Sequence, residues 1–144
     1  MESRKRQSGF TLIELLIVVV ILGIIAAIVI PQFSVATTDA KLAAVQTNLG
    51  TMRAQLQLYK FQHNDLWPTE ADVVAQMTGT TDIAGLTTGT GFGPYLLSIP
   101  ENPFVALATI EAATAGTIGN DTHGWFYSAT TGVIQADSAG HGGL

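Results

Sequence analysis

One carboxylate lies inside the most apolar part of this 144-residue sequence. Glu14 interrupts residues 10–30, a run in which Thr11 carries the only other polar side chain. A charged carboxylate in a membrane helix costs on the order of 2 to 3 kcal/mol near the centre and less near an end, so it is rarely there without a function. In hydrocarbon, an anion strongly favours a cationic partner over solitary burial. Glu14 is therefore the first candidate for a specific contact.

The other reactive side chains form no set with the spacing of a catalytic or metal site. The sequence has no cysteine, which removes disulfides, thiolate metal sites and cysteine nucleophiles. Three histidines lack metal-ligand spacing, and we expect them in turns or at the surface: His63, His123 and His141. Gly89, Gly91 and Gly93 suggest a phosphate-binding loop, but no Lys-Ser or Lys-Thr follows, so residues 79–93 are predicted to be a surface loop. The aromatic residues 125–127 are predicted to pack in the core.

Composition and length identify residues 10–30 as a membrane segment. The chain is 47% hydrophobic and only 12% charged, against a usual charged share of about 25%. At about 1.5 Å per residue, a helix over residues 10–30 spans roughly 31 Å, close to the thickness of a bilayer's hydrocarbon core. The preceding Arg4, Lys5 and Arg6 predict a cytoplasmic N-terminus, with residues 31–144 on the other side. The net charge of −5 disfavours nucleic acid as a partner.

Two interpretations of this segment compete. A cleavable signal peptide could end at the small residues 34–36 and release a secreted enzyme that begins at Thr37. Alternatively, the helix stays in the membrane and the chain is cut in front of it. Glu14 favours the second interpretation, because an ordinary export signal has no use for a carboxylate in its apolar region.

Residues 8–15, Ser-Gly-Phe-Thr-Leu-Ile-Glu-Leu, resemble the processing site of the type IV filament superfamily, which comprises type IV pilins and the pseudopilins of type II secretion. The resemblance implies that a prepilin peptidase removes a leader, residues 1–9, by cutting after Gly9, and then methylates the new amine of Phe10. That amine is cationic at neutral pH and keeps its charge when methylated. The resemblance also implies that Glu14 meets the amine of a neighbouring copy and sets the axial stagger of a helical filament.

The same resemblance implies a location and a set of partners. Before assembly the protein is a single-pass inner-membrane protein with a cytoplasmic N-terminus. An inner-membrane assembly platform then builds it into a periplasmic or extracellular filament of identical copies.

Apolar residues continue at helical spacing beyond the membrane segment: Leu42, Val45, Leu49, Met52, Leu56 and Tyr59. The spacing predicts a helix over residues 31–64, the periplasmic half of one long helix, which cleavage after Ala36 would cut. We expect the apolar stripe to pack on the domain that follows, although the repeat alone also fits a coiled coil. Gly23 and Pro31 predict a kink, and the resemblance implies that the segment between them melts on assembly.

Residues 65–144 are predicted to form a small globular α/β head. The turn residues and the Trp-Pro pair of residues 64–68 end the long helix. A Thr and an Asp three residues later predict a capped helix over residues 70–77, and residues 124–136 predict a hairpin with a Thr-Gly turn. With the resemblance, the expected fold class is α+β, the pilin fold: a long N-terminal helix, membrane-embedded in its first half, packed against a small C-terminal antiparallel sheet.

The resemblance extends into the head and favours the major-pseudopilin branch. Residues 67–70, Trp-Pro-Thr-Glu, are similar to the family's aromatic-Pro-Thr stretch, and residues 102–104 to its Asn-Pro-aromatic turn. Major pseudopilins bind calcium near their C-terminus, and only Asp121 and Asp137 are within reach here. Residues 138–144, which we expect to fray, lack the family's Asp-rich turn. We therefore expect no cofactor, with these two aspartates as weak calcium candidates.

These observations predict a structural filament subunit and not an enzyme. The filament is either a type II secretion pseudopilus or a surface type IV pilus, and the aromatic-Pro-Thr stretch and the missing cysteine pair favour the pseudopilus. A minor pilin that binds in adhesion or DNA uptake is the alternative. That role needs an exposed basic or aromatic patch, whereas Lys41, Arg53 and Lys60 are the only lysines and arginines beyond the span. A secreted enzyme is the remote alternative.

Overall fold

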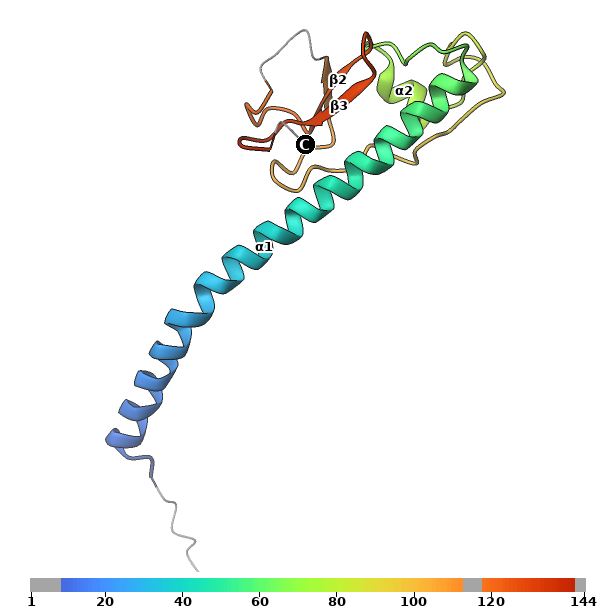
Figure 1. The fold of residues 1–144 in the computed structure, drawn as a ribbon. Helices are drawn as coiled ribbons and strands as arrows, with labels where there is room; N and C mark the ends of the chain where they lie inside the picture. Colours follow the sequence, from blue (N-terminus) through green and yellow to red (C-terminus); the bar gives the residue numbers. More distant parts are fainter. Residues whose placement is uncertain (1–8, 113–117, 142–144) are drawn as a thin grey trace, which may run out of the picture. The chain divides into compact units, whose positions relative to one another are not determined.

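The computed structural model describes residues 9–112 and 118–141, apart from the side chain of Pro31. Two helices and three strands follow one another along the chain (Figure 1). Their bounds are α1 Leu12–Gln62, α2 Val73–Thr78, β1 Ile110–Ala112, β2 Trp125–Ser128 and β3 Val133–Ala136. The chain divides into two compact units, Met1–Ala40 and Lys41–Leu144, and α1 contributes to both.

Helix α1 is continuous from Leu12 to Gln62, so the predicted extension beyond residue 31 is confirmed. Cleavage after Ala36 would cut through this helix. Its end agrees with the predicted turn, because Asn64 and Asp65 both take left-handed backbone conformations, with φ values of 54° and 62°. Left-handed residues of this kind commonly terminate helices.

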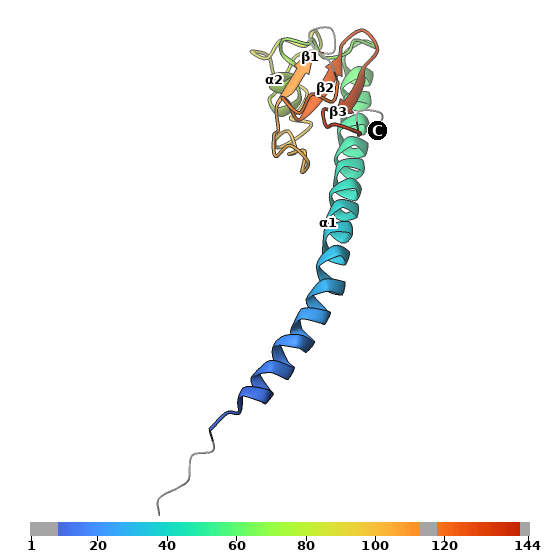
Figure 2. The same ribbon diagram turned by 90° about the vertical axis from the view of Figure 1, so that its left-hand side faces the viewer.

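In the second unit, the apolar stripe of α1 is buried against the head. Val45, Leu49, Met52, Leu56 and Tyr59 belong to one core cluster with residues of β2 and β3. In Figures 1 and 2 the sheet lies alongside this part of α1. The head's own residues thus cover the stripe, as predicted, and the coiled-coil alternative is unnecessary.

The sheet has the strand order β1-β2-β3 and is mixed. The predicted hairpin is present: β2 and β3 are antiparallel, with Tyr127 opposite Ile134. The prediction of a wholly antiparallel sheet is wrong, because β1 pairs with β2 in parallel, with Ile110 opposite Trp125. Parallel neighbours need a crossover connection of a dozen or more residues, and residues 113–124 supply that length.

Helix α2 begins later than predicted. Thr69 and Asp72 do interact, since the Asp72 N–H donates to the Thr69 hydroxyl oxygen over 3.3 Å. Residues 69–72 form a turn, however, and the helix starts only at Val73. After α2, residues 79–93 contain no helix or named strand, as expected for a loop, and a single bridge pairs Thr81 with Phe92.

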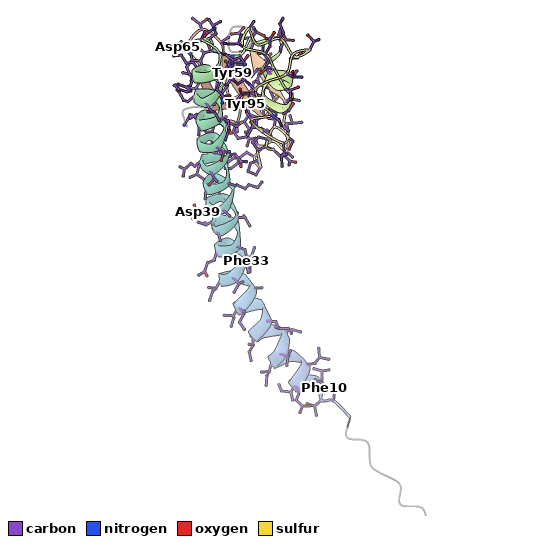
Figure 3. All side chains as sticks on the ribbon, turned by 90° about the vertical axis from the view of Figure 1, so that its right-hand side faces the viewer. Phe10, Phe33, Asp39, Tyr59, Asp65 and Tyr95 are labelled. Carbon is purple, nitrogen blue, oxygen red and sulfur yellow. The ribbon has the colours of Figure 1, made fainter. Side chains whose placement is uncertain are left out.

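The core contains a group of stacked aromatic rings that the sequence analysis did not foresee. His63, expected in a turn or at the surface, is buried with its ring stacked on Tyr59 at a centroid distance of 3.8 Å. Its Nδ1 lies 2.8 Å from the Tyr59 carbonyl oxygen and its Nε2 lies 2.9 Å from the Thr81 hydroxyl. Tyr95 meets Tyr59 edge-on, and Figure 3 labels the two residues near the C-terminal end of α1. Burial raises the pKa of Tyr59 to about 12.

Strand β2 is buried on both faces, because Trp125, Phe126 and Tyr127 are all at most 1% exposed. The Trp125 indole N–H donates to the Pro100 carbonyl and the Tyr127 hydroxyl to the Pro68 carbonyl. The prediction that these aromatic residues pack in the core is confirmed.

Two glycines of the second unit give a matched stability test. Gly132 has φ of 69°, and a Cβ placed there would collide with the indole ring of Trp67. We expect Gly132→Ala to destabilise the chain by about 1–3 kcal/mol through overpacking and backbone strain. Gly50 lies in the interior of α1, and a Cβ placed there meets nothing within 4 Å. Gly50→Ala should therefore stabilise the chain by about 0.5–1 kcal/mol, because alanine loses less backbone entropy than glycine in a helix.

Denaturant unfolding of the full chain in detergent, followed by tryptophan fluorescence, measures both effects. An equal response to the two substitutions would contradict the close contact between Gly132 and Trp67.

Candidate functional site

The start of α1 brings together three of the residues that the sequence singled out, Gly9, Phe10 and Glu14. Gly9 and Phe10 precede the helix, and the Phe10 side chain is 75% exposed. Figure 3 labels Phe10 at this end of α1. A Cβ at Gly9 would meet nothing within 4 Å. Gly9 and Phe10 are both exposed among the described residues.

Glu14 is bound to Thr11 of its own chain. One carboxylate oxygen, Oε2, accepts the Thr11 backbone N–H at 2.8 Å and the Thr11 hydroxyl at 2.7 Å. In return, the Glu14 N–H donates to the Thr11 hydroxyl oxygen over 3.3 Å. This reciprocal pattern is a capping box, which satisfies backbone N–H groups that the first helical turn leaves without partners.

Thr11 is a site residue that the sequence analysis missed. Its signal was present, because residues 11–14 read Thr-Leu-Ile-Glu, the Thr-x-x-Glu pattern of a capping box. The contact shows how the Glu14 carboxylate is satisfied while Phe10 is still linked to Gly9 and has no free amine. The helix start therefore holds a carboxylate whose described hydrogen bonds are all to Thr11.

The first unit exposes apolar side chains along α1. Between Leu12 and Ile30 its large hydrophobic residues are 37–84% exposed, and Figure 3 shows side chains standing out on several sides of the helix. The helix is long and apolar enough to cross a membrane. Such a surface must be covered by lipid or by other protein chains to avoid the cost of exposing it to water.

Gly23 and Pro31 both lie within the continuous helix α1. Proline supplies no N–H for a helical hydrogen bond, and nothing lies within 4 Å of a Cβ placed at Gly23. The kink and the melting of this segment on assembly stay predictions.

The two weak calcium candidates lie at the same end of the hairpin, Asp121 in the loop before β2 and Asp137 directly after β3. Their carboxylate oxygens accept hydrogen bonds from backbone N–H groups. Asp137 is fully buried and accepts four backbone N–H groups. Asp121 accepts the Ala139 N–H over 2.9 Å. Ser138, expected in a frayed tail, is 1% exposed; residues 142–144 lie outside the described part. Within the described residues, no three His, Cys, Asp or Glu side chains group as metal ligands.

The remaining histidines make contacts within the head. His123 Nδ1 lies 2.9 Å from the Glu111 carboxylate, and the His141 ring stacks on Phe104 at 4.0 Å. The glycines of the 79–93 loop serve close approaches of the loop itself. A Cβ at Gly89 would collide with Asp82, and one at Gly93 with the Gly79 carbonyl.

Comparison with known proteins gives consistent matches at the N-terminal end. Residues 4–30 match the family described as the prokaryotic N-terminal methylation motif. The chain is 45% identical over 60 residues, 42% of each chain, to the type II secretion system core protein G of Pseudomonas aeruginosa. It is 47% identical over 51 residues, 35% of this chain and 33% of the relative, to the type IV major fimbrial protein FimA of Dichelobacter nodosus.

Similarity to one relative extends beyond α1. The core protein G of Aeromonas hydrophila is 29% identical over 101 residues, 70% of each chain. Only 62 residues precede the end of α1, so this match includes part of the head. No solved structure matches significantly. In its methylation motif and in these stretches of sequence, the chain is similar to type IV pilins and pseudopilins.

Proposed function

We propose that this protein is the structural subunit of a helical type IV pilus-like filament, most consistent with a type II secretion pseudopilus. The observation that carries the proposal is the first half of α1, an exposed apolar helix that begins with one carboxylate. Lipid covers this helix in the precursor, and the helices of other copies cover it in the filament. Both environments remove the same apolar surface from water, at roughly 25 cal/mol per Å².

Processing gives Glu14 its second partner. Cutting after Gly9 makes Phe10 the first residue, and its amine is cationic at neutral pH. Such a cation can outcompete the neutral Thr11 donors for the carboxylate, because charge-assisted hydrogen bonds are about twice as strong as neutral ones. We propose that Glu14 of an added copy binds the Phe10 amine of its neighbour. Because each copy carries one anion and one amine, the contact repeats from copy to copy and fixes the stagger.

The implied partners are other copies, a prepilin peptidase and an inner-membrane assembly platform. The basic residues Arg4, Lys5 and Arg6 support a cytoplasmic N-terminus before processing. The head would then face the periplasm, and the assembled filament would be periplasmic or extracellular. The Aeromonas match, which reaches into the head, supports the pseudopilus over the surface pilus.

The three cationic side chains in the second half of α1 support a structural role over nucleic-acid binding or adhesion. The Lys41 ammonium lies 5.8 Å from the centre of the Phe104 ring, and that of Lys60 lies 4.6 Å from Trp67. Arg53 donates to the Ile134 carbonyl oxygen over 3.1 Å. Each cation therefore contacts a group of its own head, where cation–π and hydrogen-bond contacts stabilise the packing of head on helix. We also propose that the protein has no enzymatic role.

Mass spectrometry of the protein from assembled or membrane fractions tests the processing step. The mature chain should begin at Phe10 and carry one additional methyl group. Gly9→Leu should abolish cleavage without disturbing the fold, because Gly9 is exposed and a Cβ placed there meets nothing within 4 Å in the described part of the chain. A mature chain that begins at Thr37 would contradict the proposal.

Variants at the helix start test the role of the Glu14 charge. Glu14→Ala and Glu14→Gln should still be cleaved but should lower the filament yield by more than about tenfold, the factor that corresponds to 1.4 kcal/mol per added copy. Thr11→Ala is the matched control: it removes the hydroxyl contacts of the capping box at a cost of about 1 kcal/mol but keeps the anion and the backbone N–H of residue 11.

Electron microscopy and quantification of sheared filaments measure the result. Thr11→Ala should retain most of its filaments. Normal assembly of Glu14→Gln would show that the negative charge is unnecessary.

A further inference from the structure

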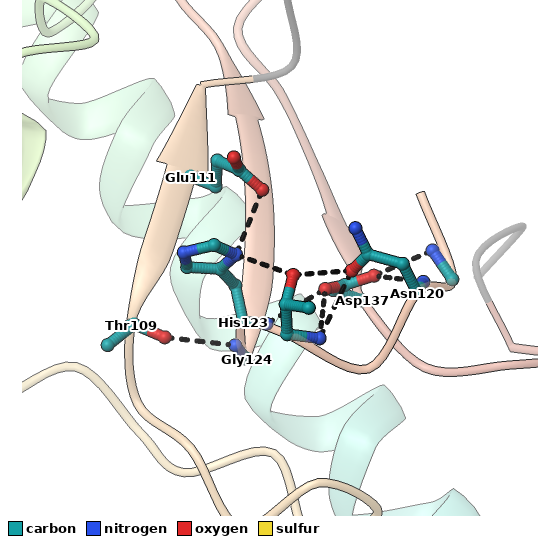
Figure 4. A network of polar contacts seen from close by, with 8 residues as sticks. Thr109, Glu111, Asn120, His123, Gly124 and Asp137 are labelled. Carbon is teal, nitrogen blue, oxygen red and sulfur yellow. Dashed lines mark hydrogen bonds and ion pairs between the residues drawn. The ribbon is translucent and has the colours of Figure 1, made fainter. Parts of the chain in front are cut away.

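The loop of residues 119–123 folds around a buried carboxylate. This loop leads into β2, whereas Asp137 follows β3 directly, so the contact joins two segments at the same end of the hairpin. Figure 4 shows the Asp137 carboxylate beside Asn120, with dashed contacts to the surrounding backbone. Asp137 has no solvent exposure.

Among the described residues, this carboxylate accepts four hydrogen bonds, and all four come from backbone N–H donors. Its Oδ1 accepts the N–H of Gly119 at 2.6 Å and that of Asn120 at 3.0 Å. Its Oδ2 accepts the N–H of Thr122 at 3.2 Å and that of His123 at 2.9 Å. A carboxylate has about four lone-pair positions. The loop therefore fills the acceptor capacity of Asp137.

The backbone of the loop is shaped for this purpose. Gly119 and Asp121 take left-handed conformations, with φ of 87° and 61°. Successive N–H groups in such alternating conformations point into one concavity and bind anions. Side-chain contacts brace the same loop: Asn120 Oδ1 accepts the Thr122 hydroxyl, and His123 pairs with Glu111 of β1.

This donor set does not fit a calcium ion, which takes six to eight oxygen ligands. A cation at Asp137 would have to displace N–H donors from the carboxylate, and the positive ends of the N–H dipoles would face the ion. The second candidate, Asp121, already uses its Oδ1 to accept the Ala139 N–H. The carboxylate oxygens of the two calcium candidates, Asp121 and Asp137, thus accept hydrogen bonds from the backbone.

We propose that Asp137 is an internal anion that orders the 119–123 loop in place of a bound cation, so that the head keeps its stability without calcium. The inference concerns the head alone and does not rest on the proposed filament function. The carboxylate joins the end of β3 to the segment that leads into β2. The start of β2 is also connected to the start of β1. The N–H groups of Gly124 and Trp125 both donate to the carbonyl oxygen of Thr109, the residue before β1.

Thermal unfolding of the full chain in detergent tests the proposal directly. The wild-type midpoint should be the same in EGTA and in excess calcium chloride, since a cation that binds only the folded state would raise it by mass action. Asp137→Asn, which keeps the shape but replaces an acceptor oxygen with an NH₂ donor, should lower the midpoint by at least about 5 °C.

Asp121→Asn is the matched control. An asparagine keeps the Oδ1 acceptor for the Ala139 N–H and tolerates the left-handed conformation, so its midpoint should equal that of the wild type. Hydrogen exchange gives a second readout: the amides of residues 119, 120, 122 and 123 should be protected in wild type and in Asp121→Asn, and exposed in Asp137→Asn.

Two results would overturn the proposal. One is a wild-type midpoint that rises with calcium, with the rise lost in Asp121→Asn. The other is an Asp137→Asn protein as stable and as protected as the wild type. If Asp137→Asn fails to fold, the wild-type comparison in EGTA and calcium and the protection of the four amides decide the matter.

Discussion

A negative charge in an apolar helix must have a partner, and the arrangement at the start of α1 depends on that constraint. Glu14 stands near the start of a segment that is suited to hydrocarbon, where an unpaired carboxylate is expensive. In the uncut chain, the capping box with Thr11 satisfies it locally. Under the proposed function, cleavage after Gly9 creates an amine four residues before Glu14, and this amine is a stronger partner for the carboxylate on every copy. The cost of burying the charge then favours one position of each copy relative to the next.

In the second unit, a small head shares one hydrophobic core with the second half of α1. The buried stripe of α1 supplies one wall, and β2 and β3 supply the other. The head adds fixed polar contacts where burial alone would not define the loops. The Trp125 indole, the Tyr127 hydroxyl and the Asp137 carboxylate all bind backbone groups of other segments.

The periodic and strongly apolar features were predictable from the sequence. The stripe from Val45 to Tyr59 and the hairpin of β2 and β3 each follow from local spacing, and the structure has both. The parallel pairing of β1 was not predictable, because a three-residue strand carries little pattern and its partner lies beyond a long connection. His63 lies in a turn, one of its two predicted locations, but its burial was not predictable for a similar reason. A polar turn follows it, but its burial depends on Thr81 and on rings distant in sequence.

The candidate sites divide in the same way. Glu14 stood out because a charge interrupts an apolar run, and the Thr11 cap could have been read from the same residues. The environment of Asp137 depends on N–H groups 14 to 18 residues away along the chain. Nothing in its sequence neighbourhood distinguishes a metal ligand from an acceptor of backbone hydrogen bonds.

A cryo-electron microscopy reconstruction of the assembled filament is the most direct measurement of the central claim. The account predicts that the Glu14 carboxylate of each copy lies within about 4 Å of the Phe10 amine of a neighbouring copy, the distance of an ion pair. A filament in which Glu14 remains bound only to Thr11 of its own chain, with the amine in contact with other groups, would contradict it.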